Sequence, residues 1–381
     1  MSAIPKGWSY TTFQEAFKYN LKTKHKAGEG LEKGAYRFFT SSPMQSKFLN
    51  EYTFKGEYLI LGTGGLPSVH YCNDAFATST DCFVVNTDVR DIHVKFVFYF
   101  LKSNIAILGR GFRGAGLKHL SRQYLDKIQI PKPPLETQKK IVAVLEKAEK
   151  LMQLREEADK LTDELLKSVF YEMFLKDNKF KMEKLGNAPI KIIDGDRGVN
   201  YPKQNDFSNS GFCLFLNTSN VRNDGFKFEN VAFIPKEKDE KLRKGKADRN
   251  DIVLTTRGTV GNVALYDKKV PYDNVRINSG MVLLRPDNQK ILSKYLFYLI
   301  RMPLIQNQFK HMNSGSAQPQ LPITNLKNAN VILPDFSLQQ KFVLIVNQIE
   351  SIKLEQTKSK QLINEFYNTI MQRAFKGELI C

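Results

Sequence analysis

The chain has 381 residues, and its 57 lysines and arginines against 39 aspartates and glutamates give a formal charge of +18 at pH 7. This length suits two to four structural units. No apolar run approaches the roughly 20 residues of a transmembrane helix, and residues 1–8 lack the layout of a secretory signal. The four cysteines form no Cys-x-x-Cys pair, which argues against a zinc module and indicates a reducing, cytoplasmic location.

The chain is an internal repeat with its charge in two places. An offset of 201 residues aligns 114–174 with 315–375 without a gap, and eleven of these 61 positions are identical, where chance gives about three or four. The segments 138–178 and 338–381 are nearly neutral, so almost all of the positive excess lies in 1–137 and 179–337. Two basic bodies, each followed by a near-neutral segment, indicate a polyanionic partner such as DNA.

The first body is expected to be an α/β domain over residues 1–132. A strand-like run at 58–60 leads into a small-residue loop, and Gly-x-Gly-x-x-Gly stands at 109–114. This motif follows a helix-like segment and not a strand, so a phosphate-facing loop is favoured over a dinucleotide site. The candidate DNA contacts of this body are Ser41, Ser42, Thr63, Gly64, Gly65, Arg110, Arg113 and Lys118. A hairpin turn or ordinary turn capping equally explains the serines and glycines.

The next segment, 133–177, predicts a long amphipathic helix that begins near Gln138, after a double proline, and ends by Asn178. Apolar residues recur in it at three- or four-residue steps. At about 1.5 Å per residue the helix is roughly 55 Å long, and an apolar stripe of that length needs a partner helix. We expect most of the stripe to form a coiled-coil seam with the second copy: Ile141, Leu145, Ala148, Met152, Leu161, Leu165, Val169 and Met173.

The second body, 178–333, repeats the first. Its loop at 257–259 follows a strand equivalent to the one before Thr63. Arg257 is expected to make a bidentate contact to guanine. Gln318 and Gln320 are expected to read adenine, to contact phosphate or simply to be solvated. Base contact or turn capping explains the polar loop residues, and Arg276 is expected to contact the DNA backbone unless it is merely solvated. The candidates are Arg197, Asn217, Ser219, Asn220, Arg257, Thr259, Arg276, Gln318 and Gln320.

The last segment, 334–381, repeats the long helix, with Gly377 as its expected stop. The sequence therefore predicts an α+β protein: two α/β domains related by a pseudo-twofold duplication and separated by two long antiparallel coiled-coil helices. Two DNA-binding bodies held at a fixed separation by the helices predict a bipartite DNA target whose central spacer is not read.

The motifs also resemble a known family. The run Ile130-Pro131-Lys132-Pro133-Pro134-Leu135-Glu136-Thr137-Gln138-Lys139-Lys140-Ile141-Val142, with the helix through Phe174, closely resembles the central conserved region of type I restriction–modification specificity (S) subunits. The second copy, from Leu333-Pro334 to Phe375, is similar to the C-terminal conserved region, although Pro334-Asp335-Phe336 lacks the double proline. The segments 56–65 and 195–198 with 256–258 resemble target-recognition domains.

The resemblance implies a DNA-binding subunit without a cofactor of its own. It implies two methyltransferase (M) subunits that bind the helices and both domains, and restriction (R) subunits that join this core. S-adenosylmethionine, ATP and Mg²⁺ are then expected in those partner subunits, and no membrane partner is expected.

Motifs for catalysis are missing from the sequence. The one Pro-Pro pair, Pro133-Pro134, lacks the Asn/Asp before it that an adenine methyltransferase needs, and there is no Gly-x-x-x-x-Gly-Lys-Ser/Thr loop. The Asp239-Glu240-Lys241 triplet has the acid-x-Lys form of a nuclease motif, but it lies in a charge-dense stretch, which favours a solvated loop. The alternatives that remain are a stand-alone DNA methyltransferase or nuclease, and a structural scaffold with two nucleic-acid-binding modules.

Overall fold

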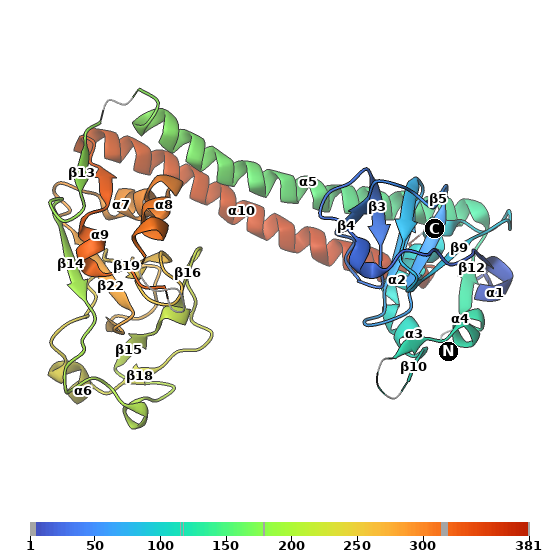
Figure 1. Ribbon diagram of the computed structural model, residues 1–381, viewed down its shortest axis with the longest axis horizontal. Coiled ribbons are helices and arrows are strands. Elements are labelled where there is room, and N and C mark those ends of the chain that lie inside the picture. Colours follow the sequence, from blue (N-terminus) through green and yellow to red (C-terminus); the bar gives the residue numbers. More distant parts are fainter. Residues whose placement is uncertain (1–4, 115, 117, 178–179, 314–318, 380–381) are drawn as a thin grey trace. The chain divides into compact units, whose positions relative to one another are not determined.

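The computed structural model describes residues 5–114, 116, 118–177, 180–313 and 319–379, so Asn178 and Gln318 lie outside the described residues. The chain divides into two compact units (Figure 1). Unit 1 is formed by residues 1–158 and 356–381, and unit 2 by residues 159–355. The division cuts through both long helices, so each unit consists of one α/β body and a part of each helix. The segment boundaries predicted from the sequence, at 132, 177 and 333, separate bodies from helices, whereas the two compact units each combine a body with helix segments.

The body of unit 1 is built on two four-stranded sheets. The first joins β2 (Lys18–Tyr19), β9 (Cys82–Asn86), β6 (Tyr58–Gly62) and β7 (Val69–Cys72) in that order, with every pair antiparallel. The second joins β4 (Lys47–Leu49), β3 (Tyr36–Phe39), β8 (Ala75–Thr78) and β5 (Phe54–Lys55), and its β3–β8 pair is parallel. Strands β6 and β9 are mostly apolar, and most of their side chains are buried, because other elements cover both of their faces.

Short elements complete this body. Two further antiparallel pairs are β1 (Ser9–Thr12) with β12 (Gln129–Lys132) and β10 (Phe112–Arg113) with β11 (His119–Leu120). The helices are α1 (Phe13–Ala16), α2 (Val94–Ser103), α3 (Ile105–Gly109) and α4 (Arg122–Asp126), with a 3-10 turn η1 (Ala27–Glu29). Helix α2 lies against β6 and β7, which places the main core of unit 1 between the first sheet and the helices.

Unit 2 repeats this plan. The sheet β14 (Ile190–Asp194), β22 (Met281–Pro286), β19 (Ile252–Thr255), β20 (Val263–Leu265) matches the first sheet of unit 1 in order and direction. The sheet β18 (Phe233–Ile234), β15 (Cys213–Leu216), β21 (Val275–Ile277) keeps one parallel pair, β15–β21. The remaining elements are β13 (Met182–Lys184) with β23 (Asn330–Ile332), β16 (Val221–Arg222) with β17 (Gly225–Phe226), η2 (Gln204–Asp206), η3 (Thr218–Asn220), α6 (Lys236–Lys241), α7 (Ser293–Arg301), α8 (Pro303–Met312) and α9 (Ile323–Lys327). The predicted duplication of an α/β body is confirmed.

The two long helices are α5 (Leu135–Phe174) and α10 (Phe336–Phe375), each of 40 residues. Helix α5 begins three residues before the predicted start at Gln138. A buried glutamine fixes each start to its body: the Gln138 amide donates to the carbonyls of Asp91 and Pro133 at 2.8 and 2.9 Å and accepts the His93 N–H at 2.8 Å. Gln339 makes the same three bonds. Gly377, with φ +73°, ends α10 as expected, because it adopts the left-handed conformation without strain.

The helices pack antiparallel within each unit. In unit 1, Ile141 and Leu145 of α5 share a core with Ile370 and Ala374 of α10. In unit 2, the ring centroids of Phe170 and Phe342 are 5.7 Å apart. A residue early in one helix therefore meets a residue late in the other, as predicted.

The predicted composition of the seam is wrong at two positions. Leu161 and Leu165 are 58% and 47% exposed, although both belong to the apolar periodicity of α5. The seam instead uses Leu166 and Phe170, which are buried. The apolar residues of α5 therefore form a buried face and a second, exposed face. In the part of the chain that the structure describes, no helix is both long and apolar enough to cross a membrane.

Candidate DNA interface

The first candidate loop of unit 1 begins where β6 ends. The buried Thr63 accepts the Leu120 N–H at 2.8 Å through its carbonyl oxygen. Gly64 forms an isolated antiparallel bridge with His119, and Gly65 turns the chain at φ +72°, a conformation that favours glycine. The loop at 63–65 is thus bound to the β10–β11 hairpin.

The serine loop lies against the same turn. A Cβ on Gly62 would come within 2.8 Å of the Ser41 Cα, so the absence of a side chain allows the close approach. Ser68 Oγ donates to the Ser41 carbonyl at 3.1 Å, and His70 Nε2 lies 2.9 Å from the carbonyl of the exposed Ser42. The structure therefore brings Ser41, Ser42 and the glycine turn together.

The loop at 63–65 and the β10–β11 hairpin form a junction, and the basic candidates of unit 1 flank it. Arg110, Arg113 and Lys118 are all exposed. Arg113 pairs in register with His119, and its guanidinium donates to the Arg110 carbonyl at 2.6 Å. Three cations beside an exposed histidine form a positively charged rim, which suits contact with DNA phosphates.

Unit 2 has the same junction with different side chains. The Thr256 carbonyl accepts the Leu321 N–H at 2.8 Å, Arg257 bridges Gln320, and Gly258 turns the chain at φ +72°. Thr259, in the same loop, is exposed. The predicted equivalence of the loops at 63–65 and 257–259 is confirmed as backbone geometry, while DNA contact by their side chains stays a prediction.

A cavity of about 280 Å³ opens beside this junction, and Arg197, Arg257 and Gln320 are among its lining residues. The Arg197 guanidinium is positioned by Asp194 Oδ1 at 3.1 Å and by the Ser279 carbonyl at 3.3 Å. The structure thus gathers three of the predicted contacts of unit 2 around one hollow.

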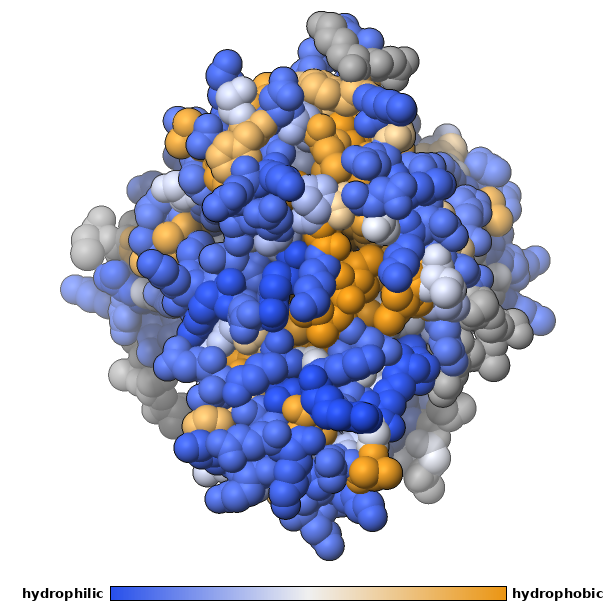
Figure 2. Space-filling view, turned by 90° about the vertical axis from the view of Figure 1, so that its left-hand side faces the viewer, coloured by the Kyte–Doolittle hydropathy of each residue, from blue (hydrophilic) through white to orange (hydrophobic). Residues whose placement is uncertain are grey.

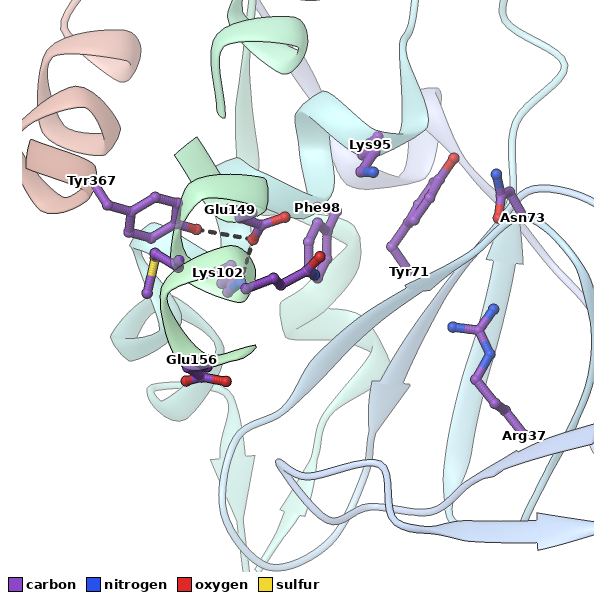
Figure 3. Close-up of a pocket in the computed structure, with 11 residues that line it drawn as sticks. Arg37, Tyr71, Asn73, Lys95, Phe98, Lys102, Glu149, Glu156 and Tyr367 are labelled. Carbon is purple, nitrogen blue, oxygen red and sulfur yellow. Dashed lines mark hydrogen bonds and ion pairs between the residues drawn. The ribbon is translucent and has the colours of Figure 1, made fainter. Parts of the chain in front are cut away.

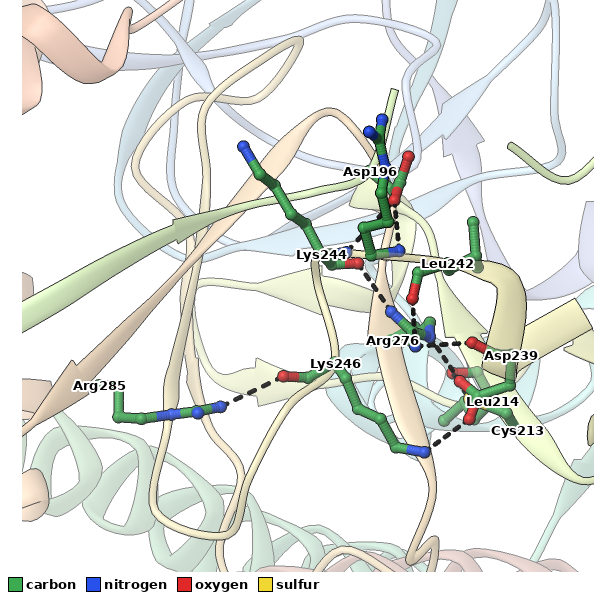
Figure 4. A network of polar contacts seen from close by, with 10 residues as sticks. Asp196, Cys213, Leu214, Asp239, Leu242, Lys244, Lys246, Arg276 and Arg285 are labelled. Atoms are coloured by element: carbon green, nitrogen blue, oxygen red, sulfur yellow. Dashed lines mark hydrogen bonds and ion pairs between the residues drawn. The ribbon is translucent and has the colours of Figure 1, made fainter. Parts of the chain in front are cut away.

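Sequence reasoning did not single out Arg243 and Lys244, which follow closely after the Asp239-Glu240-Lys241 triplet. The buried carboxylate of Asp196 accepts the N–H groups of Arg243 and Lys244 at 2.7 and 3.2 Å (Figure 4). It also accepts the Gly198 N–H at 2.7 Å. Burial alone would raise the pKa of Asp196, but these backbone hydrogen bonds hold it below its ordinary value. Asp196 thereby places two exposed cations beside Arg197. The sequence signal that could have pointed to them is the Gly-Asp-Arg-Gly turn at 195–198. No local pattern, however, reveals which loop its aspartate binds.

The prediction that Arg276 contacts the DNA backbone is wrong. It is only 5% exposed, and its guanidinium forms an ion pair with the buried Asp239 and donates to the carbonyls of Lys244 and Leu242 at 2.7 and 3.1 Å (Figure 4). Burial alone would raise the pKa of Asp239, but hydrogen bonds from Lys246 and Arg276 lower it. Arg276 therefore stabilises unit 2 and is not available to DNA phosphates. Asp239 likewise belongs to this buried network and not to a solvated loop.

For the loop at 217–220, the hydrogen bonds favour turn capping over contact with bases. Asn217 Oδ1 accepts the Ser219 N–H at 2.8 Å and caps η3. Asn220 is buried and donates to the carbonyls of Lys227 and Asn230 at 3.0 and 2.8 Å, so its amide is occupied by backbone. Only Ser219 of this loop is exposed. The remaining candidate, Gln318, lies outside the described residues.

A cavity of about 650 Å³ in unit 1 is lined by residues of the body and of both long helices (Figure 3). Glu149 lies in its wall and accepts the Tyr99 and Tyr367 hydroxyls at 2.7 and 3.1 Å and the Lys102 ammonium at 2.8 Å. Burial alone would raise the pKa of Glu149, but these hydrogen bonds lower it. A carboxylate held by three donors acts as a structural anchor. Among the residues described, no group of three or more His, Cys, Asp or Glu is placed to hold a metal ion.

Apolar side chains also reach the surface. Seen from the left-hand side of Figure 1, a mostly hydrophilic surface carries a hydrophobic patch in its middle (Figure 2). The helices add two exposed sets at positions related by the 201-residue repeat. Leu151, Leu362 and Phe366 are exposed in unit 1, and Ile352, Leu161 and Leu165 in unit 2. Exposed apolar residues therefore recur at equivalent helix positions in the two copies.

The family model of the type I restriction modification DNA specificity domain matches residues 5–162 and 191–365. The chain belongs to this specificity family. Each match covers one body and most of the long helix that follows it, so each copy of the repeat corresponds to one specificity domain.

Relatives and solved structures agree with this membership. The specificity subunit of the type I restriction enzyme MjaVIII from Methanocaldococcus jannaschii is 24% identical over 300 residues, which cover 74% of this chain and 70% of the relative. That of EcoBI from Escherichia coli is 22% identical over 371 residues, or 89% and 77% of the two chains. The S subunit from M. genitalium superposes with a TM-score of 0.61 at 16% identity over 98% of this chain and 97% of its own. A chain solved in work on complex assembly and conformational transition of the type I system gives 0.63 at 17% identity over the whole of both chains. These likenesses show that the fold is that of specificity subunits.

Proposed function

We propose that this specificity subunit reads a bipartite DNA target, with each unit contacting one half-site. The observation that carries the proposal is the repeated junction, Thr63–Leu120 in unit 1 and Thr256–Leu321 in unit 2, because each copy bears exposed basic side chains beside it. Basic side chains contribute salt-dependent affinity through phosphates, and loop residues between them supply base contacts.

The helices have two proposed roles. Their length of about 60 Å sets the spacer between the half-sites, and their exposed apolar sets dock partner subunits. Because Leu151, Leu362 and Phe366 recur as Ile352, Leu161 and Leu165, we infer two copies of the same partner, one for each unit. Methyltransferase subunits fit this role, and restriction subunits would join the resulting core.

The chain is proposed to be a non-catalytic, cytoplasmic subunit. The carboxylates Glu149, Asp196 and Asp239 have structural hydrogen-bond partners, which leaves them poorly suited to acid–base chemistry. S-adenosylmethionine, ATP and Mg²⁺ would be bound by the partner subunits.

The test is a binding selection from a randomised duplex library, followed by methylation of the selected DNA. Together with its methyltransferase, the chain should select one asymmetric sequence with an unread centre and direct methylation to it. Structured RNA serves as the control against a general nucleic-acid scaffold. Methyl transfer by the chain alone, or binding without sequence preference, would contradict the proposal.

A further inference from the structure

His119 was not among the residues expected to contact DNA. It lies in β11, beside the glycine turn of unit 1, where Gly64 bridges it. A Cβ on Gly64 would be 3.7 Å from both Cε1 and Nδ1 of the imidazole. The ring therefore stands alongside a backbone that has no side chain to cover it.

Gln320 occupies the same position in unit 2. It bridges Arg257, and the neighbouring Leu321 N–H repeats the 2.8 Å hydrogen bond that Leu120 makes in unit 1. His119 and Gln320 are also separated by the 201-residue offset of the repeat. Position and hydrogen bonding thus agree on the equivalence.

The direction of both side chains follows from their neighbours. Leu120 and Leu321 are buried, and consecutive residues of an extended segment point to opposite faces. His119 and Gln320 consequently project away from the core, and His119 is exposed. The basic residues Arg113 and Lys118 flank the histidine, while Arg197 and Arg257 line the cavity beside the glutamine.

We propose that His119 and Gln320 are equivalent base-reading residues, one for each half-site. This inference rests on the function proposed above. A glutamine reads adenine through its N6 and N7 atoms, and an arginine reads guanine through O6 and N7. The two nitrogens of an imidazole point to different sides of the ring, so we expect only one of them, as donor or acceptor, to contact the edge of a base.

The residue that bridges the base-reading side chain differs between the units, glycine in unit 1 and arginine in unit 2, so the two half-sites are read by different chemistry. In unit 2, Arg257 and Gln320 present two adjacent base-reading groups, which suit neighbouring guanine and adenine. In unit 1, Gly64 contributes no side chain, so His119 has no base-reading partner across the bridge, and the glycine leaves room for the base pair to approach. One repeated scaffold therefore reads two different sequences.

The experiment compares His119→Ala, Gln320→Ala and the wild type, each in complex with its methyltransferase, by selection from a randomised duplex library. His119→Ala should lose the preference at one base pair of one half-site by about tenfold or more, and Gln320→Ala at one base pair of the other. His119→Gln should change the preferred base at the position that His119→Ala relaxes. Lys118→Ala is the matched control: as a phosphate contact it should weaken all sequences alike and reduce the salt dependence.

Thermal unfolding of each variant shows whether it folds, and because His119 is exposed its replacement should leave the midpoint unchanged. If the wild type selects a bipartite sequence and His119→Ala keeps every base preference, the assignment of His119 is overturned while the proposed function stands. If the wild type itself selects no sequence, both are overturned.

Discussion

The Tyr99 hydroxyl donates a 2.7 Å hydrogen bond to the Glu149 carboxylate, and the chain repeats this bond at 2.8 Å between Tyr298 and Glu350. Each bond joins the main helix of an α/β body, α2 or α7, to the long helix that follows it in sequence. A lysine reinforces each carboxylate: Lys102 in unit 1 and Lys294 in unit 2, at 2.8 and 2.7 Å. The orientation of each body on its helix is thus fixed by a charge-assisted bond that the duplication preserved.

Loss of this bond should destabilise the protein. Tyr99→Phe leaves the ring in the core but removes one donor to a carboxylate, so we expect the free energy of unfolding to fall by about 1.5–3 kcal/mol. Urea denaturation followed by circular dichroism measures the change. Tyr10→Phe, at an exposed tyrosine, is the control, and equal midpoints for both variants would contradict the anchoring role.

Arg276→Ala distinguishes a structural arginine from a DNA contact. Removal of one partner of a buried ion pair costs about 3–5 kcal/mol, so the variant should unfold at clearly lower denaturant concentration. Arg197→Ala is the matched control, because its exposed guanidinium should affect DNA binding and leave stability nearly unchanged. A stable Arg276→Ala protein with weakened DNA binding would reverse the assignment.

The Asp196 turn predicts a pH dependence. Its pKa is lower in the folded protein than in the unfolded chain, so its contribution to stability is present above the unfolded value of about 3.9 and is lost as the pH falls through the lower, folded value. Asp196→Ala should remove this contribution at neutral pH and weaken DNA binding by displacing Arg243 and Lys244.

Denaturation of both proteins between pH 7 and pH 3 checks this sign. The stability difference between wild type and Asp196→Ala should stay constant down to about pH 5 and shrink below it. A difference that grows on acidification would refute the argument.

The exposed helix residues should matter for partner binding alone. Phe366→Asp and Leu165→Asp place a charge in the proposed docking sets, so each should reduce co-purification of the methyltransferase while the isolated subunit keeps its stability. Gln372→Asp, at an exposed polar position of α10, is the control for added charge. Undiminished co-purification of both variants would exclude these surfaces as docking sites.

Helix length should set the spacer. Insertion of seven residues at matched positions of α5 and α10 adds about 10 Å, or about three base pairs at 3.4 Å each, while the 3.5-residue periodicity of the seam is kept. The selected target should then keep both half-sites and gain a longer centre. An insertion in one helix alone mismatches the seam and should destabilise the subunit.

The sequence alone determined the repeat, the two long helices and the loops that follow equivalent strands. These features depend on local periodicity and on identities at a fixed offset, such as Gln138 with Gln339, which the structure explains by identical hydrogen bonds. The same comparison identified Arg257 and Gln320 as candidate contacts, because both stand in loops beside small residues.

Tertiary structure decided which of the many charged and apolar residues face solvent. Periodicity predicts that Leu161 and Leu165 lie in the seam, yet both are exposed and the neighbouring Leu166 is buried, because burial depends on where the partner helix and the body lie. Composition likewise cannot separate Arg276 from Arg243: one is buried by an ion pair with Asp239 and the other is held at the surface through Asp196. Both outcomes arise from contacts between segments more than 30 residues apart, and such contacts have no signature in the local sequence.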